Sequence, residues 1–278
     1  MWYLNSPFSE IITTEDKYLI AVRILTYQLL HDPSTRTRDP TTPFLVLVND
    51  KVRPAARERL RKDGAIVVPV PKLTASWLKP HRSAWQDVMT KLRLWELLDF
   101  ERVAFLDADT LLARPLDDVF TDPAAVEQRT LPGYKGAVPG AATPPETYVF
   151  AGNANHVHVW MDAKGRTDHL CAGFFVLKPD LALLRYYISI LQIPESFMSQ
   201  APEEALLNVA HQWGQGMPWL QLNTTLNVRL PGMADLEEGA RSAHVKWWES
   251  APGNVKKWML EWRGRMEDFY ETRDRRRG

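Results

Sequence analysis

One stretch of the sequence decides the fold class: Arg102-Val103-Ala104-Phe105-Leu106-Asp107-Ala108-Asp109-Thr110-Leu111. Its apolar part predicts a buried strand over 103–106, and two carboxylates follow at once. In open α/β sheets the ligand crevice lies beyond the carboxyl ends of the strands, so Asp107 and Asp109 lie where a ligand would bind. Carboxylate oxygens suit Mg²⁺ or Mn²⁺, and such an ion can bridge to the phosphates of a substrate. The same residues also suit a surface turn with two solvated aspartates.

Two classes of metal-dependent enzyme have an apolar strand that ends in Asp-x-Asp. Phosphatases of the haloacid-dehalogenase type require Gly and then Thr after the second aspartate, whereas Thr110 follows Asp109 directly here. Those phosphatases also place the motif near the start of their domain, and several expected strands and helices precede Asp107. A metal-dependent phosphatase stays as an alternative, and nucleotide-sugar transfer is the other class.

Strand-like and helix-like stretches alternate on both sides of the motif, a pattern typical of a mainly parallel central sheet flanked by helices. The expected strands are 10–13, 44–48, 65–70, 103–106 and 173–177, and the expected helices begin near 14, 54, 85 and 180. Thr13 or Thr14 is expected to cap the first helix. The clearest helical stripe consists of Trp85, Val88, Met89, Leu92, Trp95 and Leu98. We therefore predict an α/β fold in a single domain over residues 1–278.

The amino-acid composition limits the kinds of binding partner and of site that can be expected. The 278 residues carry 34 basic and 34 acidic side chains, so the formal net charge is zero and no basic excess indicates a nucleic-acid partner. The single cysteine, Cys171, excludes an intramolecular disulfide and a multi-cysteine zinc site. Residues 1–10 lack the features of a signal peptide, and no run is long enough to predict a membrane span. We leave the compartment open between the cytoplasm and, for a protein with a further membrane anchor, the Golgi lumen.

The segment 121–169 is rich in Pro, Gly, Ala and Thr, so we expect a long loop or insertion. Its ends adjoin the metal strand and Asp168, which indicates a wall on the acceptor side. The residues expected to contact an acceptor are Asn153, Asn155, His156, His158 and Trp160. The arginine-rich tail 265–278 is expected to be a frayed, solvated end.

Further segments occur in a fixed order around the Asp-x-Asp motif. They are Thr90-Lys91-Leu92-Arg93-Leu94-Trp95-Glu96-Leu97, Pro115-Leu116-Asp117-Asp118-Val119-Phe120, Ala172-Gly173-Phe174-Phe175-Val176, Glu203-Glu204-Ala205-Leu206-Leu207-Asn208 and His244-Val245-Lys246-Trp247. In this order the chain resembles the glycogenin-like family 8 glycosyltransferases of the fungal type, over roughly residues 11–248. The resemblance implies a GT-A fold and retaining transfer of a sugar from a nucleotide-diphosphate donor, a UDP-sugar, with Mn²⁺ or Mg²⁺.

The resemblance also implies roles for residues at the nucleotide end of the site. Asp107, Asp109 and His244 would hold the cation. Lys246 would contact the diphosphate, although the family has a longer spacer and a proline before the tryptophan. The nucleotide would lie against the backbone of Ile12, Thr14 and Ala108, with Tyr18 stacked on the base. Tyr18 is equally suited to be the first core residue of its helix.

At the sugar end, the resemblance implies that Lys91 points into the donor site, that Asp168 binds sugar hydroxyls and that Glu204 lies near the anomeric carbon. Cys171 and Ala172 replace an Asn-Ser pair of the family, and Glu203 and Glu204 replace an Asp-Gln pair. These changes leave the sugar unidentified. Alternatives are a solvated Lys91 and two glutamates that only cap a helix.

The partners implied are a nucleotide-sugar donor and a glycan, protein or small-molecule acceptor, with no nucleic acid. The oligomeric state is not indicated. A non-catalytic protein that binds sugar nucleotides is a further alternative, because the sugar-facing positions depart from the family while the cation-binding positions do not.

Overall fold

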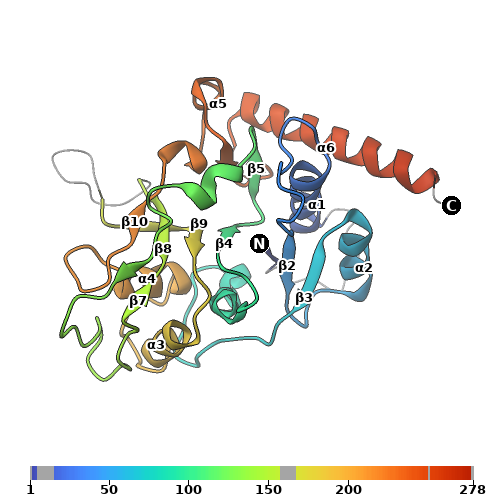
Figure 1. Cartoon of the computed structure of the whole chain (residues 1–278). Helices are drawn as coiled ribbons and strands as arrows, with labels where there is room; N and C mark the ends of the chain where they lie inside the picture. The colour runs from blue at the N-terminus through green and yellow to red at the C-terminus, as the bar shows by residue number, and fades with distance from the viewer. Residues whose placement is uncertain (1, 5–15, 157–166, 250, 277–278) are drawn as a thin grey trace. The chain divides into compact units, whose positions relative to one another are not determined.

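The structure is a computed structural model that describes residues 2–4, 16–156, 167–249 and 251–276; of residues 2–4 and Ala84 only the backbone is described. The chain forms two compact units (Figure 1). Unit 1 comprises Met1–Pro69, Leu106–Asp117 and Thr224–Gly278, and unit 2 comprises Val70–Phe105 and Asp118–Asn223. Each unit contains both sheet and helices, so the predicted α/β class is confirmed. The expectation of a single domain stays a prediction.

Unit 1 contains a parallel sheet in the order β1 (Trp2–Leu4), β2 (Leu45–Val48), β3 (Ile66–Pro69), joined by helices α1 (Lys17–Leu30) and α2 (Pro54–Asp63). All four residues of β2 are buried, as expected for the middle strand of a covered parallel sheet. The strands expected at 44–48 and 65–70 and the helix expected at 54 are confirmed. The strand expected at 10–13 lies outside the described residues.

Helix α1 begins after Asp16, whose side chain accepts a hydrogen bond from Leu19 N at 3.1 Å. The prediction of a cap at Thr13 or Thr14 is wrong, because this aspartate supplies the acceptor for the first turn. Further along α1, the buried Gln28 exchanges two hydrogen bonds with the backbone of Leu112, through its amide nitrogen at 2.7 Å and its oxygen at 2.8 Å. Gln28 therefore fixes β5 (Thr110–Leu112) against α1.

A second sheet of unit 1 brings together segments from distant parts of the sequence. Its order is β11 (Val228–Arg229), β12 (Ser242–His244), β5, with β12 parallel to β11 and antiparallel to β5. A 3₁₀ helix at Thr224–Leu226 and the short helix α5 (Met233–Glu238) connect to these strands. The register places His244 opposite Thr110, next to the Asp-x-Asp motif.

The C-terminal helix α6 (Gly253–Arg275) packs against α1, and both contribute to one core cluster. Its buried residues recur every three or four positions, which makes one continuous apolar face: Val255, Met259, Trp262, Met266 and Tyr270. The expectation of a frayed tail is therefore wrong for residues 265–275.

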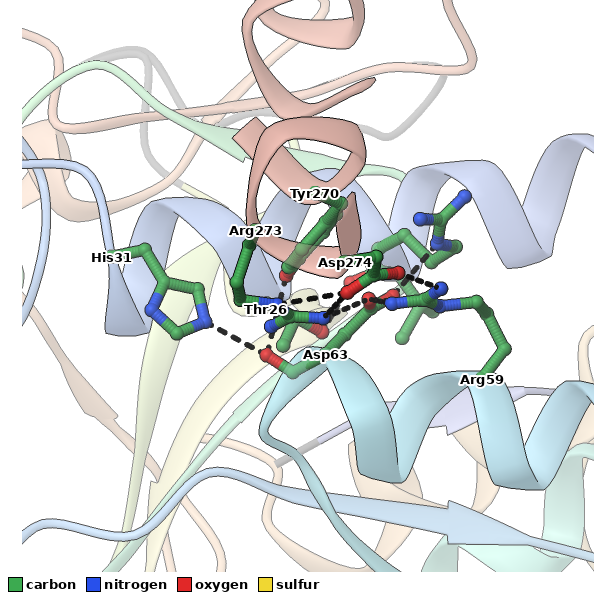
Figure 2. Close-up of polar contacts among 9 residues, drawn as sticks. Thr26, His31, Arg59, Asp63, Tyr270, Arg273 and Asp274 are labelled. Atoms are coloured by element: carbon green, nitrogen blue, oxygen red, sulfur yellow. Dashed lines mark hydrogen bonds and ion pairs between the residues drawn. The ribbon is translucent and has the colours of Figure 1, made fainter. Parts of the chain in front are cut away.

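A buried carboxylate fastens the end of α6 to α1 and α2 (Figure 2). Asp63 is completely buried, and its carboxylate accepts hydrogen bonds from Arg23 Nε at 2.7 Å and Arg59 Nε at 2.9 Å. Arg273 of α6 lies 3.6 Å from the same carboxylate, and Asp274 accepts from Arg59 Nη1 at 2.7 Å. The arginines pair with carboxylates, which is the condition for burying such charges.

Unit 2 is built on a four-stranded sheet in the order β10 (Leu220–Gln221), β8 (Phe150–Ala154), β9 (Leu170–Leu177), β4 (Val103–Leu106). Strand β10 is parallel to β8, and β8 is antiparallel to β9. The unit's long α-helices are α3 (Leu181–Leu191), capped by Asp180, and α4 (Pro202–Ala210). The core is aromatic, with ring contacts among Trp95, Phe105, Phe150, Phe175 and Tyr187.

The helix expected over 85–98 differs from the prediction. The chain forms 3₁₀ helices at Ser83–Trp85 and Val88–Glu96 instead of one α-helix. Most of the predicted stripe is buried, but Leu98 is 56% exposed because the helix ends before it. Apolar residues three or four apart suit either helix type over so short a span, so the pattern alone does not separate them.

The segment 121–169 is only partly the loop that was expected. After the 3₁₀ helix Asp117–Thr121 it contains the ribbon β6 (Gln128–Arg129) and β7 (Thr147–Tyr148), and then β8 of the main sheet. Gly152 in β8 has no room for a side chain, since an added Cβ would lie 2.5 Å from Leu170 Cδ1. The stretch 150–154 is thus structural, and 157–166 lies outside the described residues.

Candidate active site

Asp107, Ala108 and Asp109 form the turn that connects β4 to β5. The amide of Thr110 donates to the carbonyl of Asp107 at 3.1 Å, which closes the turn. Asp107 is half-buried, whereas Asp109 is only 4% exposed. Both carboxylates therefore stand just beyond β4, as the strand-then-carboxylate pattern predicts.

His244 reaches this turn through the pairing of β12 with β5. The amide of Val245 donates to the carbonyl of Asp109 at 3.1 Å and continues that pairing past the end of the strand. His244 Nε2 then lies 3.4 Å from Asp109 Oδ1 and 3.8 Å from Asp107 Oδ2. The pairing of β12 with β5 therefore brings together Asp107, Asp109 and His244, the three side chains that were expected to hold a cation.

The donor set of this trio fits a divalent cation. One ligand atom from each of Asp107, Asp109 and His244 lies within 4.8 Å of the others. In an octahedral site with bonds of about 2.1 Å, neighbouring ligand atoms are about 3 Å apart and opposite ones about 4.2 Å apart. The two measured nitrogen–oxygen distances fall between these values. Two carboxylates and one imidazole suit Mn²⁺, which accepts oxygen ligands and tolerates nitrogen.

Lys246 lies beside the trio and pairs with Asp109. Its Nζ is 2.9 Å from Asp109 Oδ2, and both side chains are largely buried. Burial by itself raises the pKa of Asp109, but the charges of His244 and Lys246 outweigh burial and hold that pKa well below its usual value. Burial by itself lowers the pKa of Lys246. The charge of Asp109 raises it by more, so the pKa of Lys246 lies above its usual value. The pair is ionised at neutral pH.

Tyr18, in the first turn of α1, contacts the ring of Trp248 edge-on, with centroids 4.9 Å apart. Burial raises its pKa to about 12; the charge of Lys246 opposes this, and those of Asp109 and Asp107 add to it. Tyr18 is only half-buried, so it presents an aromatic surface near Asp107, Asp109 and Lys246 and is not a closed core residue. Ile12 and Thr14 lie outside the described residues.

Lys91 belongs to unit 2 and is neither solvated nor exposed. It is 2% exposed, donates to the carbonyl of Ala172 at 2.9 Å, and forms an ion pair with Glu203 at 3.2 Å. Its ammonium also lies 4.6 Å from the centre of the Phe105 ring. The alternative of a solvated lysine is therefore wrong.

Glu204 is the centre of a second polar network in unit 2. Its Oε1 accepts hydrogen bonds from Asn155 Nδ2 at 3.2 Å and from His169 Nε2 at 3.1 Å, and its Oε2 accepts from Ala172 N at 3.1 Å. The hypothesis that Glu204 only caps α4 is wrong, because the helix has no side-chain cap and this carboxylate bonds other elements. Asp168 is exposed and accepts from Gln212 Nε2 at 3.2 Å.

Some residues of these clusters were missed or assigned differently from sequence. His169 carries no motif of its own, and its only signal is its place next to Asp168 at the start of β9. Asn155, which was expected to contact an acceptor, donates a hydrogen bond to Glu204. Trp248 was missed although it directly follows the predicted Lys246-Trp247 pair. His158 and Trp160 lie outside the described residues.

Comparisons with known proteins connect the chain with glycosyltransferases. No protein-family model matches it. It is 25% identical over 304 residues to the uncharacterized protein C5H10.12c of Schizosaccharomyces pombe, covering 96% of this chain and 80% of that protein. It is also 30% identical over 105 residues to inositol phosphorylceramide glucuronosyltransferase 1 of Arabidopsis thaliana, which covers 38% of this chain and 18% of the plant protein.

The fold resembles that of the glycosyltransferase GlyE of Streptococcus pneumoniae TIGR4. The TM-score is 0.55 to its apo form, with 11% identity over 98% of this chain, and 0.52 to a second crystal structure, with 12% identity over 88%. This chain spans 62% and 58% of the length of those two chains. Among the residues that the structure describes, no helix is both long and apolar enough to cross a bilayer. The chain has an α/β fold of the GT-A type.

Proposed function

We propose that this chain is a glycosyltransferase that moves a sugar from a nucleotide-diphosphate donor, a UDP-sugar, to an acceptor with the help of a divalent cation. The observation that carries the proposal is the convergence of Asp107, Asp109 and His244, with Lys246 beside them. Two carboxylates, an imidazole and an ammonium in one place suit a cation together with a diphosphate. The resemblance to family 8 enzymes and the likeness to glycosyltransferases in fold support the same activity.

Departure of the nucleoside diphosphate requires stabilisation of the negative charge that develops on the leaving oxygen. A bound Mn²⁺ or Mg²⁺ supplies Lewis-acid stabilisation of that charge. In our proposal Asp107, Asp109 and His244 hold the cation, and Lys246 adds positive charge at the same phosphate oxygens. Tyr18 stacks on the base, and the backbone of Ile12, Thr14 and Ala108 contacts the nucleotide.

Residues of unit 2 are proposed for the sugar. Asp168, which is exposed, would accept hydrogen bonds from sugar hydroxyls, and Lys91 would position the donor through its pair with Glu203. Both oxygens of Glu204 already accept hydrogen bonds. A carboxylate fixed in this way is better suited to stabilise positive charge at the anomeric carbon than to move and attack it. We therefore propose retaining transfer in which Glu204 is an electrostatic stabiliser.

The Arabidopsis relative is named a glucuronosyltransferase, so among UDP-sugars we propose UDP-glucuronate as the first donor to test. Purified protein with Mn²⁺ and a panel of UDP-sugars is expected to release UDP slowly to water even without an acceptor. The expected signal is release from one donor well above the others, abolished by a chelator. A protein that binds these nucleotides without releasing UDP is the non-catalytic alternative.

The cation site is tested with the variant Asp107→Asn, and Asp50→Asn is its matched control. Asp107 is chosen over Asp109 because it is half-buried, whereas Asp109 is only 4% exposed and pairs with Lys246. Removing one cation ligand should lower the Mn²⁺-dependent rate by at least about 100-fold. Asp50 is exposed in the same unit and should leave the rate within about twofold. Equal rates for the two variants would contradict the cation site.

A further inference from the structure

The loop between α4 and β10 is held closed by its own groups. The amide of Trp219 donates to the carbonyl of His211 at 3.0 Å, which joins the two ends of the loop. His211 is completely buried, and its Nδ1 lies 2.8 Å from the carbonyl oxygen of Met217. Near the tip, the amide of Gln215 donates to the carbonyl of Gln212 at 3.2 Å. Because these backbone groups are satisfied within the loop, its shape does not depend on a ligand.

The same loop is also packed against β7 and the segment before it. The amide of Leu131 donates to the carbonyl of Gly216 at 2.8 Å, and Tyr148 Oη donates to the carbonyl of Pro218 at 2.8 Å. Gly216 lies so close to Tyr134 that an added Cβ would be 2.1 Å from the Cγ of that ring. All of these residues belong to unit 2, so the loop is a fixed part of that unit.

This loop presents the indole ring of Trp213, which is half-buried. The Nε1 of Trp213 donates to the carbonyl of Trp219 at 3.0 Å. Its ring lies against the ring of Trp219, with centroids 4.9 Å and planes 30° apart, and Trp219 is completely buried. The indole N–H is therefore already engaged, and the part of the ring that stays open to solvent is a flat apolar surface held in one orientation.

The side chains that flank this ring in the loop are polar, and none is cationic. Gln212 and Gln215 are exposed, and residues 211–221 contain no lysine or arginine. Gln212 Nε2 donates to the exposed carboxylate of Asp168, at 3.2 Å from Oδ2. Trp219 Nε1 donates to the backbone carbonyl of Asp168 at 2.9 Å, which ties Asp168 to the tryptophan pair.

A flat apolar ring with amides and a carboxylate beside it suits a sugar. A pyranose has C–H groups on its faces, which pack on an aromatic ring, and hydroxyl groups around its edge. An amide both donates and accepts hydrogen bonds, as a hydroxyl group does. An anionic ligand would require lysine or arginine and would be repelled by Asp168. The ligand class indicated is therefore a neutral pyranose.

We propose that Trp213 is the platform of a subsite that binds a neutral pyranose ring of the acceptor, while Gln212 and Gln215 hydrogen-bond its hydroxyl groups. Binding of the sugar stands on the loop alone, and its role as acceptor rests on the proposed function. Asp168, which is proposed to bind the donor sugar, is bonded to the Trp219 that backs the platform. Since transfer requires the acceptor to lie beside the donor sugar, a subsite at Trp213 is well placed for it.

The experiment measures binding of the methyl glycosides of glucose, galactose, mannose and xylose to the full chain by saturation-transfer NMR, without donor or metal. We expect at least one of them to bind with a dissociation constant of about 1 mM. Trp213→Leu keeps an apolar side chain against Trp219 but removes the flat ring, and should weaken that binding by about tenfold or more. If this variant does not fold, Gln212→Ala, at an exposed position, should weaken binding by about threefold or more.

Trp77→Leu is the matched control. Trp77 is a half-buried tryptophan of the same unit whose Nε1 donates to the carbonyl of Leu191 at 2.9 Å, and its loss should leave the affinity within about twofold. Glycosides that do not bind the wild type, or that bind it and the Trp213 and Gln212 variants equally, would overturn the sugar-binding subsite.

A second measurement tests the acceptor role. With a UDP-sugar and Mn²⁺, the glycoside that binds should raise the rate of UDP release, and Trp213→Leu should need about tenfold more of it for the same increase. A glycoside that binds through Trp213 without changing the wild-type rate would exclude the acceptor role. A protein that binds the glycoside and releases no UDP from any donor would contradict the proposed function and leave the sugar-binding subsite in place.

Discussion

Glu204 shows how much a single side chain can be constrained by its donors. Three hydrogen-bond donors converge on its two oxygens: Asn155 and His169 on one, and Ala172 N on the other. A glutamine offers only one acceptor oxygen, so Glu204→Gln must turn its amide towards one of these donors. The carboxylate charge is lost at the same time.

We expect Glu204→Gln to lower the rate of sugar transfer by about 100-fold or more, because the substitution removes the fixed negative charge that we propose to lie near the reacting sugar. The affinity for UDP with Mn²⁺ should change by less than about threefold, since the proposed nucleotide ligands are other residues. Steady-state rates and UDP calorimetry measure the two effects separately.

The control for this variant is Glu127→Gln, which breaks an exposed ion pair with Lys178 in the same unit. Surface pairs of this kind contribute about 0–1 kcal/mol, so rate and affinity should stay near the wild-type values. If Glu204→Gln weakened UDP binding as much as it slowed transfer, Glu204 would belong to the nucleotide side and our assignment would be wrong.

Residues inside one contiguous motif could be predicted from the sequence, and their partners often could not. Asp107 and Asp109 follow directly from the strand that precedes them. His244 was assigned to the cation through the resemblance to family 8 enzymes. The pairing of β12 with β5 brings it to the two aspartates. Lys91 was expected in the site, but nothing in its neighbours indicates that Glu203 and Ala172 bury it. Such contacts depend on tertiary packing, which a local pattern does not contain.

Among the elements, the clarity of the local pattern decided which were predicted correctly, and length did not: the four-residue β2 was identified and the 23-residue α6 was not. The apolar run of β2 and the polar helix α2, which begins at Pro54, both have clear local signals. Strand β8 was hidden in a Gly- and Ala-rich stretch, where Gly152 is required by close packing and not by a loop. The end of α6 was misjudged because its arginines indicate solvent, whereas the buried carboxylate of Asp63 receives one of them.

The link between α2 and α6 can be tested at Asp63. Asp63→Asn removes the charge that Arg23 and Arg59 share, while the side chain keeps its size. Removing one partner from a buried charge network costs about 3–5 kcal/mol, because the remaining charges are left uncompensated. We expect urea denaturation to show a decrease of that size in the free energy of unfolding.

Asp274→Asn is the matched control, because Asp274 pairs with Arg59 in the same cluster but its side chain is 39% exposed, whereas that of Asp63 is fully buried. Hydrogen bonds from Arg59 and Arg273 lower the pKa of Asp274 to about 2, yet solvent screens a partly exposed pair and we expect a cost below about 1 kcal/mol. Equal losses for the two variants would mean that burial of Asp63 does not determine the strength of this link.

For the molecule as a whole, the core of unit 2 encloses a titratable group. His211 is fully buried, its Nδ1 is 2.8 Å from the carbonyl of Met217, and Tyr187 Oη contacts its Nε2. A carbonyl only accepts, so Nδ1 carries the proton, and Nε2 accepts from the tyrosine hydroxyl. Both ring nitrogens are satisfied in the neutral form, and burial lowers the pKa of His211 to about 3.

This histidine makes the stability of the protein depend on pH in a defined window. The pKa of His211 is about 3 in the folded protein, against an ordinary value of 6.5 for histidine. Between these values the unfolded chain binds a proton that the folded one does not, so stability is lost as the pH falls below about 6.5. From pH 7 to pH 5 the loss from this group is about 2 kcal/mol, at 1.36 kcal/mol for each unit. Other groups also titrate, so urea denaturation of the wild type should be compared with His211→Gln at both pH values. The wild type should lose about 2 kcal/mol more than the variant over this interval, and an equal loss in both would show that His211 is protonated in the folded state.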